Sequence, residues 1–320
     1  MEKRALSEEM FHSFSEENGK WHKLLEIVKR DKTLDLEFRG NKACIYYRGG
    51  VLFTVTNDGL NFNTEYSKDY PECEIELLAN PSETYAIKNI PFYKQAIDYN
   101  VDAKGKMERD FEQLVVRDNN YARNDIAIHT DYFIADMEYK VQGNDTKPEF
   151  DLVAIKWPTT KRGLPESPTV ALIEMKYGDN AIRTKKPSRE DKVGNSGLKK
   201  HLEDFHQFLA NEATRKEFCK DMEEIFNQKC RLGICIIDNP EKQQIRTPIC
   251  IKNFTIEVIF LLANHQPRNG KLRKELQTVN FSDYDFPVRF AVSSMMGYGL
   301  YDNGETMWSP ERCKFFAASN

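Results

Sequence analysis

The chain has 320 residues, of which 40% are hydrophobic and 30% are charged, and its net charge is −4. This length fits one large domain or two of ordinary size, with enough apolar residues for a real core. The charge excludes a uniformly basic nucleic-acid-binding surface but is compatible with a local basic groove. Because no apolar run approaches about 18 residues and the N-terminus has no apolar signal core, the sequence predicts a cytoplasmic protein with no membrane partner.

The 7 cysteines indicate the same compartment. They are scattered and odd in number, and none belongs to the C-x-x-C pair that structural zinc sites use. We therefore expect reduced, partly buried thiols without bound zinc.

Residues 1–98 are predicted to form a β-rich accessory domain. Apolar residues recur at helical spacing between Trp21 and Val28, which indicates a short amphipathic helix. Short runs rich in β-branched and aromatic residues follow, separated by glycine-containing turns, and they predict an antiparallel meander: LDLEFRG, ACIYYRGG, VLFTVTNDG and LNFNTEY. We interpret the proline-containing stretch from Pro71 to about Tyr99 as a connector.

The aromatic and basic residues of this meander allow two interpretations. Arg39 and Arg48 stand beside glycine turns, with Tyr46, Tyr47 and Phe53 nearby in the sequence, an arrangement that suits phosphate contacts and base stacking. The alternative is that the aromatic residues only fill the core of a β-module. The composition fits an accessory recognition domain as well as a protein–protein module.

Residues 99–320 are predicted to form a second domain, with a core at about 101–265 and a C-terminal extension at 266–320. KMERDFEQLVVRDN carries an apolar helical stripe, and three strands follow in DYFIADMEYKV, EFDLVAIKW and VALIEMKYG. Two helices come next, over SGLKKHLEDFHQFLAN and from Glu212 to Gln228, and then two strands in RLGICIID and FTIEVIFLLA. This order predicts a mixed α/β or α+β sheet flanked by helices. In the extension, LRKEL is compatible with a helix and PVRFAVSS with a strand.

Two of these strands carry charges inside apolar runs, which is costly unless the charges are paired or bind a metal. Strand alternation places Asp151 at the end of one apolar row, and Glu174 and Lys176 at the end of another. A hairpin whose turn centres near Arg162 and Gly163 sets Asp151 opposite Glu174, with Cβ atoms about 5 Å apart. We therefore expect the acids to emerge together at an edge of the sheet.

Two carboxylates this close repel each other unless a cation lies between them or one is protonated. Carboxylate oxygens are ligands suited to Mg²⁺ or Mn²⁺. Such an ion polarises phosphoryl oxygens, and Lys176 is placed to orient an attacking water or to stabilise developing negative charge. The alternative for Asp151, Glu174 and Lys176 is a cross-strand salt-bridge cluster of little energetic weight.

The pattern Asp-x(22)-Glu-x-Lys, on two adjacent strands after an acidic helix, resembles the PD-(D/E)XK nuclease superfamily. The resemblance covers about residues 101–265, and Phe150 stands where the family has a proline before the first acid. It implies a restriction-endonuclease-like fold and a Mg²⁺-dependent phosphodiesterase that acts on nucleic acid, with DNA favoured. It is also compatible with a homodimer.

The resemblance also implies roles for particular residues. Asp151 and Glu174 would hold the metal and Lys176 would take part in catalysis. A glutamate of the preceding helix would complete the metal shell, Glu108 being slightly favoured over Glu112. The helix after the second strand would supply a polar substrate contact, for which Lys199, Lys200 and His201 are candidates.

A basic segment directly follows the second of these strands. Between residues 183 and 200 seven cations face two acids, in a chain whose net charge is negative. Its candidate phosphate-binding residues are Arg183, Lys185, Lys186, Arg189, Lys192, Lys199 and Lys200. Such a loop would hold nucleic acid in a salt-dependent manner, and the alternative is an ordinary surface loop.

Two rival functions are compatible with the same residues. One is a non-catalytic module that keeps the nuclease fold and binds nucleic acid or a partner protein. The other is a generic α/β interaction protein whose acidic cluster binds no metal.

Overall fold

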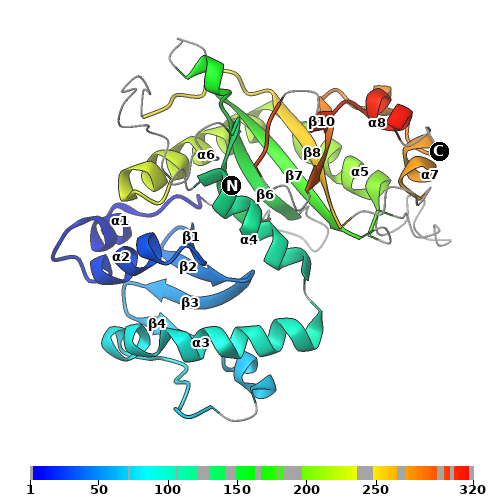
Figure 1. The fold of residues 1–320 in the computed structure, drawn as a ribbon. Helices are drawn as coiled ribbons and strands as arrows, with labels where there is room; N and C mark the ends of the chain where they lie inside the picture. Colours follow the sequence, from blue (N-terminus) through cyan, green and yellow to red (C-terminus); the bar gives the residue numbers. More distant parts are fainter. Residues whose placement is uncertain are drawn as a thin grey trace.

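The computed structural model of the protein contains two sheets and the helices that cover them (Figure 1). It describes residues 3–70, 73–105, 107–120, 130–140, 149–162, 167–178, 181–182, 197–235, 248–264, 271–293, 299–302 and 306–316. Within these ranges no helix combines the length and the apolar character needed to cross a bilayer.

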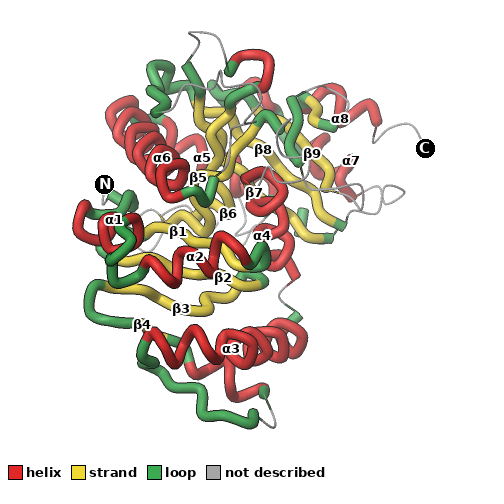
Figure 2. Tube along the Cα trace, turned by 60° about the vertical axis from the view of Figure 1, so that its left-hand side comes forward, coloured by secondary structure: helices red, strands yellow, loops and turns green. Residues whose placement is uncertain are grey.

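The first sheet is the antiparallel meander that the turn signals predict. Its strands follow one another in chain order: β1 (Leu34–Phe38), β2 (Lys42–Tyr47), β3 (Gly50–Thr56) and β4 (Leu60–Asn61). The helix α2 (His22–Arg30) packs on β1 and the helix α3 (Glu83–Lys104) packs on β3, while α1 (Glu8–Ser15) packs on α2. In Figure 2 the helix α3 runs along one side of this sheet, where Tyr93 packs its ring against Phe53 and Phe62.

The second sheet is mixed and has the strand order β10-β9-β8-β7-β6-β5. Strands β5, β6 and β7 are antiparallel neighbours, whereas β8 is parallel to β7 and β9 is parallel to β8. The bounds are β5 (Tyr132–Lys140), β6 (Glu149–Lys156), β7 (Thr169–Tyr177), β8 (Ile256–Ala263), β9 (Val288–Ser293) and β10 (Met307–Trp308). The predicted mixed α/β architecture is therefore confirmed. The N-terminal part contains the predicted meander, but more of its residues are helical than extended, so it is not the β-rich unit that the sequence predicts.

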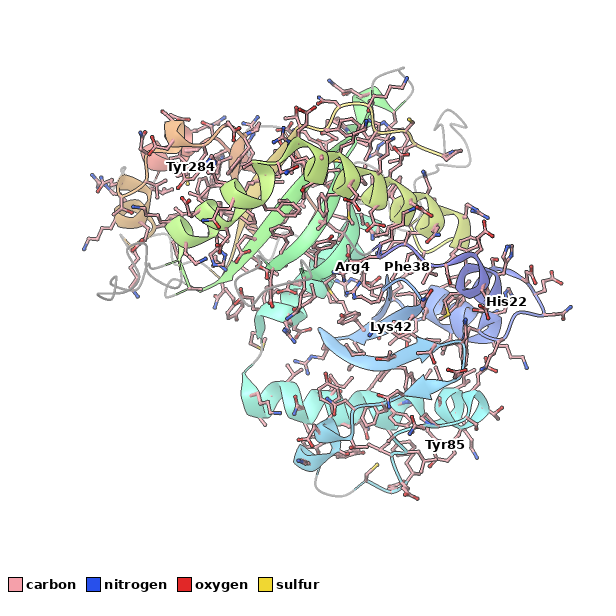
Figure 3. The ribbon with its side chains drawn as sticks, turned by 180° about the vertical axis from the view of Figure 1, so that it is seen from behind. Arg4, His22, Phe38, Lys42, Tyr85 and Tyr284 are labelled. Atoms are coloured by element: carbon pink, nitrogen blue, oxygen red, sulfur yellow. The ribbon has the colours of Figure 1, made fainter. Side chains whose placement is uncertain are left out.

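Helices cover both faces of the second sheet. They are α4 (Met107–Asn120), α5 (Leu198–Leu209), α6 (Glu212–Leu232), α7 (Lys271–Gln277) and α8 (Pro310–Phe316). Apolar residues of α4 pack on one face of β5, β6 and β7, and those of α5 and α6 pack on the other. In Figure 1 the helix α4 lies in front of the sheet and α6 lies behind it, and in Figure 3, which shows the opposite side, α6 is in front.

Two sequence interpretations are wrong. The stretch between Pro71 and Tyr99 is largely helical, because Ser82 caps α3 and Pro91 is accommodated inside it, so the helix continues to Lys104. The run RLGICIID is not a strand over its described residues, since α6 extends to Leu232 and ends at Gly233 in the left-handed conformation. Short apolar runs do not distinguish a helix end from a buried strand.

The two sheets are joined by buried charged side chains, which we call the charged seam: Arg4, Glu37, Arg39, Asp136 and Lys229. Lys229 of α6 lies 2.6 Å from Glu37 of β1, and both side chains are almost completely buried. Arg39 and Arg4 contact the buried carboxylate of Asp136 in β5 at 2.7 and 2.9 Å. In Figure 3, Arg4 lies at this junction.

The N-terminal segment is also fixed to α6 through its backbone. The N–H groups of Arg4 and Ala5 donate to the Asp221 carboxylate at 3.0 and 3.2 Å. Leu6 exchanges two hydrogen bonds of 2.8 and 2.9 Å with the Gln228 amide. The beginning of the chain therefore docks on the second sheet's helical layer, beside the first sheet.

The seam leads to a stability prediction. We expect Lys229→Met to lower the free energy of unfolding by about 3–5 kcal/mol, because it leaves the Glu37 carboxylate buried without its counter-charge. Urea denaturation measures this change. The double variant Glu37→Leu/Lys229→Met should recover most of the loss, since it removes both charges. A single variant as stable as the parent would contradict a contribution of this pair.

Candidate functional site

The predicted site residues lie where β6 begins and β7 ends. The ladder pairs Leu152 with Ile173 and Val153 with Leu172, so its next step sets Asp151 opposite Glu174. This is the register that the symmetric hairpin predicts. The two neighbouring carboxylates have different partners.

Each carboxylate at this strand end has its own donors. Asp151 Oδ2 accepts a hydrogen bond of 2.6 Å from the Met175 backbone N–H. Glu174 Oε1 is paired with the Lys176 ammonium and lies 3.0 Å from His201 Nδ1 of α5. The other oxygen of Glu174 is buried and has no hydrogen-bond partner among the described residues. Glu174 therefore has one oxygen left for a ligand.

The helix α4 is fixed over the strands by its polar side chains. Gln113 donates to the backbone oxygens of Thr33 and Tyr46 at 2.9 and 3.1 Å and accepts from the Gly49 N–H at 2.8 Å. Gly49 adopts a φ of +69°, and a Cβ atom there would lie 2.4 Å from the Cβ of Arg109. The β2–β3 turn therefore needs glycine where it touches α4.

This docking brings two acids of α4 to the strand end. Glu108 and Glu112 lie one turn apart, and together with Asp151 they offer three carboxylate oxygens within 4.8 Å of one another. The sequence slightly favours Glu108 over Glu112 as the additional metal ligand, and the structure brings both glutamates to the site. Glu112 is 2% exposed, and one of its oxygens is buried without a hydrogen-bond partner among the described residues.

The three acids line a cleft of about 540 Å³ together with Arg109, Glu138 and Tyr177. Lys176 Nζ lies 4.0 Å from Glu108 Oε1, so its ammonium stands between Glu174 and the α4 acids. The structure therefore brings together Asp151, Glu108 and Glu112, with Glu174 and Lys176 beside them. This arrangement can hold a cation that prefers oxygen ligands.

Burial dominates the electrostatics of the acids. It raises the pKa of Asp151 to about 7, although the Lys176 ammonium and the Met175 N–H oppose the rise. It also raises the pKa of Glu108, and it raises the pKa values of Glu112 and Glu174 well above the ordinary range, with the Asp151 charge adding to the last two. Without a bound cation, the cluster favours protonated carboxyls.

The two nitrogen groups of the site differ in charge. Burial opposes the charge of Lys176, but Glu174 and Asp151 outweigh it and raise the pKa of the ammonium. Burial lowers the pKa of His201 to about 3, and the nearby Lys176 and Lys200 ammoniums add to this effect. Lys176 is therefore a fixed cation, whereas His201 is neutral, so its 3.0 Å contact with Glu174 is not an ion pair.

Sequence reasoning missed the ion pair that borders the cleft. Arg109 Nε lies 2.9 Å from Glu138 Oε1, and Glu138 adopts a φ of +54° in the middle of β5. The flanking pairs Met137–Leu152 and Tyr139–Phe150 place Glu138 level with Asp151 on the neighbouring strand. An Arg–Glu contact between a helix and an irregular strand has no periodic signal in the sequence.

The basic segment is described only at its end. Arg183, Lys185, Lys186, Arg189 and Lys192 lie outside the described residues. Lys199 is exposed on α5, and Lys200 pairs with Asp204 one turn further along that helix. Of the three candidate substrate contacts on α5, His201 is the one that touches the acidic cluster.

We expect Asp151→Asn to stabilise the metal-free protein at neutral and higher pH. The folded-state pKa of about 7 exceeds the ordinary value of about 3.9, so ionisation of Asp151 costs stability as the pH rises between these values. The variant should be less sensitive to pH, with a gain of about 2–4 kcal/mol at about pH 8. Urea denaturation in EDTA at about pH 5 and about pH 8 measures it. An equal pH dependence in both proteins would contradict the raised pKa.

Comparison of the chain with protein-family models, with curated proteins and with solved structures returned no match.

Proposed function

We propose that the protein is a metal-dependent nuclease that hydrolyses phosphodiester bonds of nucleic acid, DNA being the favoured substrate. The observation that carries this proposal is the convergence of Glu108, Glu112 and Asp151 within 4.8 Å, beside the Lys176 cation. The order of α4, three antiparallel strands, α5, α6 and the parallel strand β8 supports a restriction-endonuclease-like core.

The donor set fits Mg²⁺ or Mn²⁺. All the converging ligands are carboxylate oxygens, which such ions prefer. One buried oxygen of Glu112 has no hydrogen-bond partner among the described residues, and a cation held by the three converging acids would satisfy it. Asp151, Glu108 and Glu112 would hold the ion, with Glu174 as an additional ligand. When bound, the ion supplies Lewis-acid stabilisation of negative charge on a phosphoryl oxygen.

Lys176 contributes a fixed positive charge to the reaction. The carboxylates around it raise its pKa, so it remains protonated and favours stabilisation of the phosphorane-like transition state over proton abstraction. The contact with Glu174 holds the Lys176 ammonium next to the three converging acids. The neutral His201 holds the same Glu174 oxygen from α5, and so positions both groups.

The first test is cleavage of plasmid and of linear DNA in the presence of Mg²⁺, Mn²⁺ or EDTA. We expect metal-dependent cutting that Asp151→Asn lowers by at least about a hundredfold, because the variant removes a charge that the transition state requires. Asp58→Asn is the matched control, since Asp58 is an exposed turn residue far from α4 in the sequence. Equal cutting by Asp151→Asn would overturn the assignment. A wild-type protein that binds DNA but does not cut it would favour a non-catalytic module.

Binding of Mn²⁺ gives a readout that does not depend on activity. Calorimetry should show an affinity that rises with pH up to about 7, because the ion must displace protons from carboxyls whose pKa is raised. Glu112→Gln should weaken binding by about tenfold or more. Glu65→Gln, at an exposed acid of the N-terminal part, should have no effect. Identical affinities for both variants would exclude Glu112 as a ligand.

A further inference from the structure

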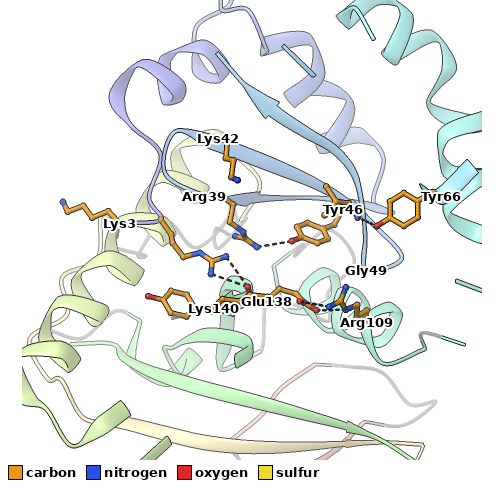
Figure 4. Close-up of a pocket in the computed structure, with 12 residues that line it drawn as sticks. Lys3, Arg39, Lys42, Tyr46, Gly49, Tyr66, Arg109, Glu138 and Lys140 are labelled. Carbon is orange, nitrogen blue, oxygen red and sulfur yellow. Dashed lines mark hydrogen bonds and ion pairs between the residues drawn. The ribbon is translucent and has the colours of Figure 1, made fainter. Parts of the chain in front are cut away.

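A second cavity lies on the other side of the Arg109–Glu138 ion pair. It has a volume of about 570 Å³, and Figure 4 shows its lining residues between the first sheet and β5. Glu138 is the acidic residue in its lining. Six cationic side chains also line it: Lys3, Arg4, Arg39, Lys42, Arg109 and Lys140. We call this cavity the basic pocket.

Buried carboxylates hold the two guanidinium groups at the back of the basic pocket. Arg4 and Arg39 share one carboxylate, that of Asp136, and their side chains are only 11% and 14% exposed. The nearby Glu37 is already paired with Lys229. Two further buried carboxylates lie in this region: Asp221, which accepts from the Arg4 backbone N–H, and Asp35, which is close to Glu37 and Lys229. The positive charge available to a ligand therefore comes mainly from the rim of the basic pocket.

The lysines at the rim add further positive charge. Lys42 is exposed at the start of β2, and its ammonium contacts no carboxylate among the described residues. Lys3 and Lys140 pair with Glu224 and Glu149, but all four of these side chains are largely exposed. Such surface pairs are worth little, so both lysines can turn toward an anion.

Two tyrosine hydroxyls face the basic pocket as further hydrogen-bond donors. Tyr46 Oη accepts from Arg39 at 3.2 Å, and Tyr66 Oη accepts from the Val51 N–H at 3.3 Å. Each hydroxyl keeps its own hydrogen for an acceptor. Figure 4 shows both rings at the pocket together with Arg39 and Lys42. Guanidinium, ammonium and hydroxyl donors around one cavity suit phosphate oxygens.

The basic pocket and the acidic cleft are neighbours, because Arg109 and Glu138 line both. A nucleic-acid strand that places one phosphodiester in the cleft carries further phosphates on each side of it. We infer that the basic pocket binds backbone phosphates of the same strand, next to the one that is cleaved. This inference rests on the proposed function and gives the N-terminal sheet a part in substrate binding.

The test measures binding without cleavage. The probe is a fluorescein-labelled single-stranded DNA oligonucleotide, titrated with wild-type protein in EDTA at several salt concentrations and followed by anisotropy. For Lys42→Ala we expect severalfold weaker binding and a slope of log K against log salt that is smaller by about 0.7, as for one lost phosphate contact. The matched control is Lys88→Ala, at an exposed lysine of α3 that does not line the pocket.

The outcomes separate this inference from the proposed function. Binding that depends on Lys42, in a protein that never cleaves, would support the basic pocket and overturn the nuclease. Cleavage together with an unchanged salt slope in Lys42→Ala would overturn phosphate binding by the basic pocket and leave the proposed nuclease activity intact.

Competition by a mononucleotide at the same total phosphate concentration distinguishes binding of a nucleic-acid strand from binding of a small ligand. Equal displacement by the mononucleotide and by an unlabelled oligonucleotide would overturn binding of a strand.

Discussion

The carboxylate of Asp136 is the point on which the arrangement of the protein depends. It is completely buried in β5, where an ion without counter-charges would be very costly. Arg39 reaches it from the end of β1, and Arg4 reaches it from the N-terminal segment. The same guanidinium groups bind the backbone oxygens of Met137 and Glu138, so the irregular part of β5 is satisfied only when the first sheet and the N-terminal segment are in place.

This constraint also shapes the two cavities. The register of β5 shifts between Ile134 and Asp136, and Glu138 takes a left-handed conformation that costs energy for a residue with a Cβ. The carboxylate of Glu138 is held by Arg109 of α4, and this pair separates the acidic cleft from the basic pocket. The cations that hold the two sheets together therefore lie on one side of the Arg109–Glu138 pair. The acids whose ionised form is disfavoured by burial lie on the other side.

Much of the architecture could be predicted because it is local. The alternating rows of EFDLVAIKW and VALIEMKYG and the symmetric loop between them are sufficient for the register that sets Asp151 opposite Glu174. The helical stripe of α4 and the meander are equally readable from periodicity and turn residues. The prediction failed for α3, where Pro91 inside the helix and an even spread of polar residues hide the helical pattern.

The sequence by itself determined the meander, the helix α4 and the strands β5 to β8, together with the strand-end acids and the lysine two residues beyond Glu174. Only the tertiary structure decided that both Glu108 and Glu112 reach Asp151, because this depends on how Gln113 and Gly49 dock α4 against the first sheet. The contact between Arg4 and Asp136, which are 132 residues apart in the sequence, is likewise visible only in the tertiary structure. Contacts between distant segments are selected by burial and charge pairing in the folded chain, and neither leaves a repeating pattern in the sequence.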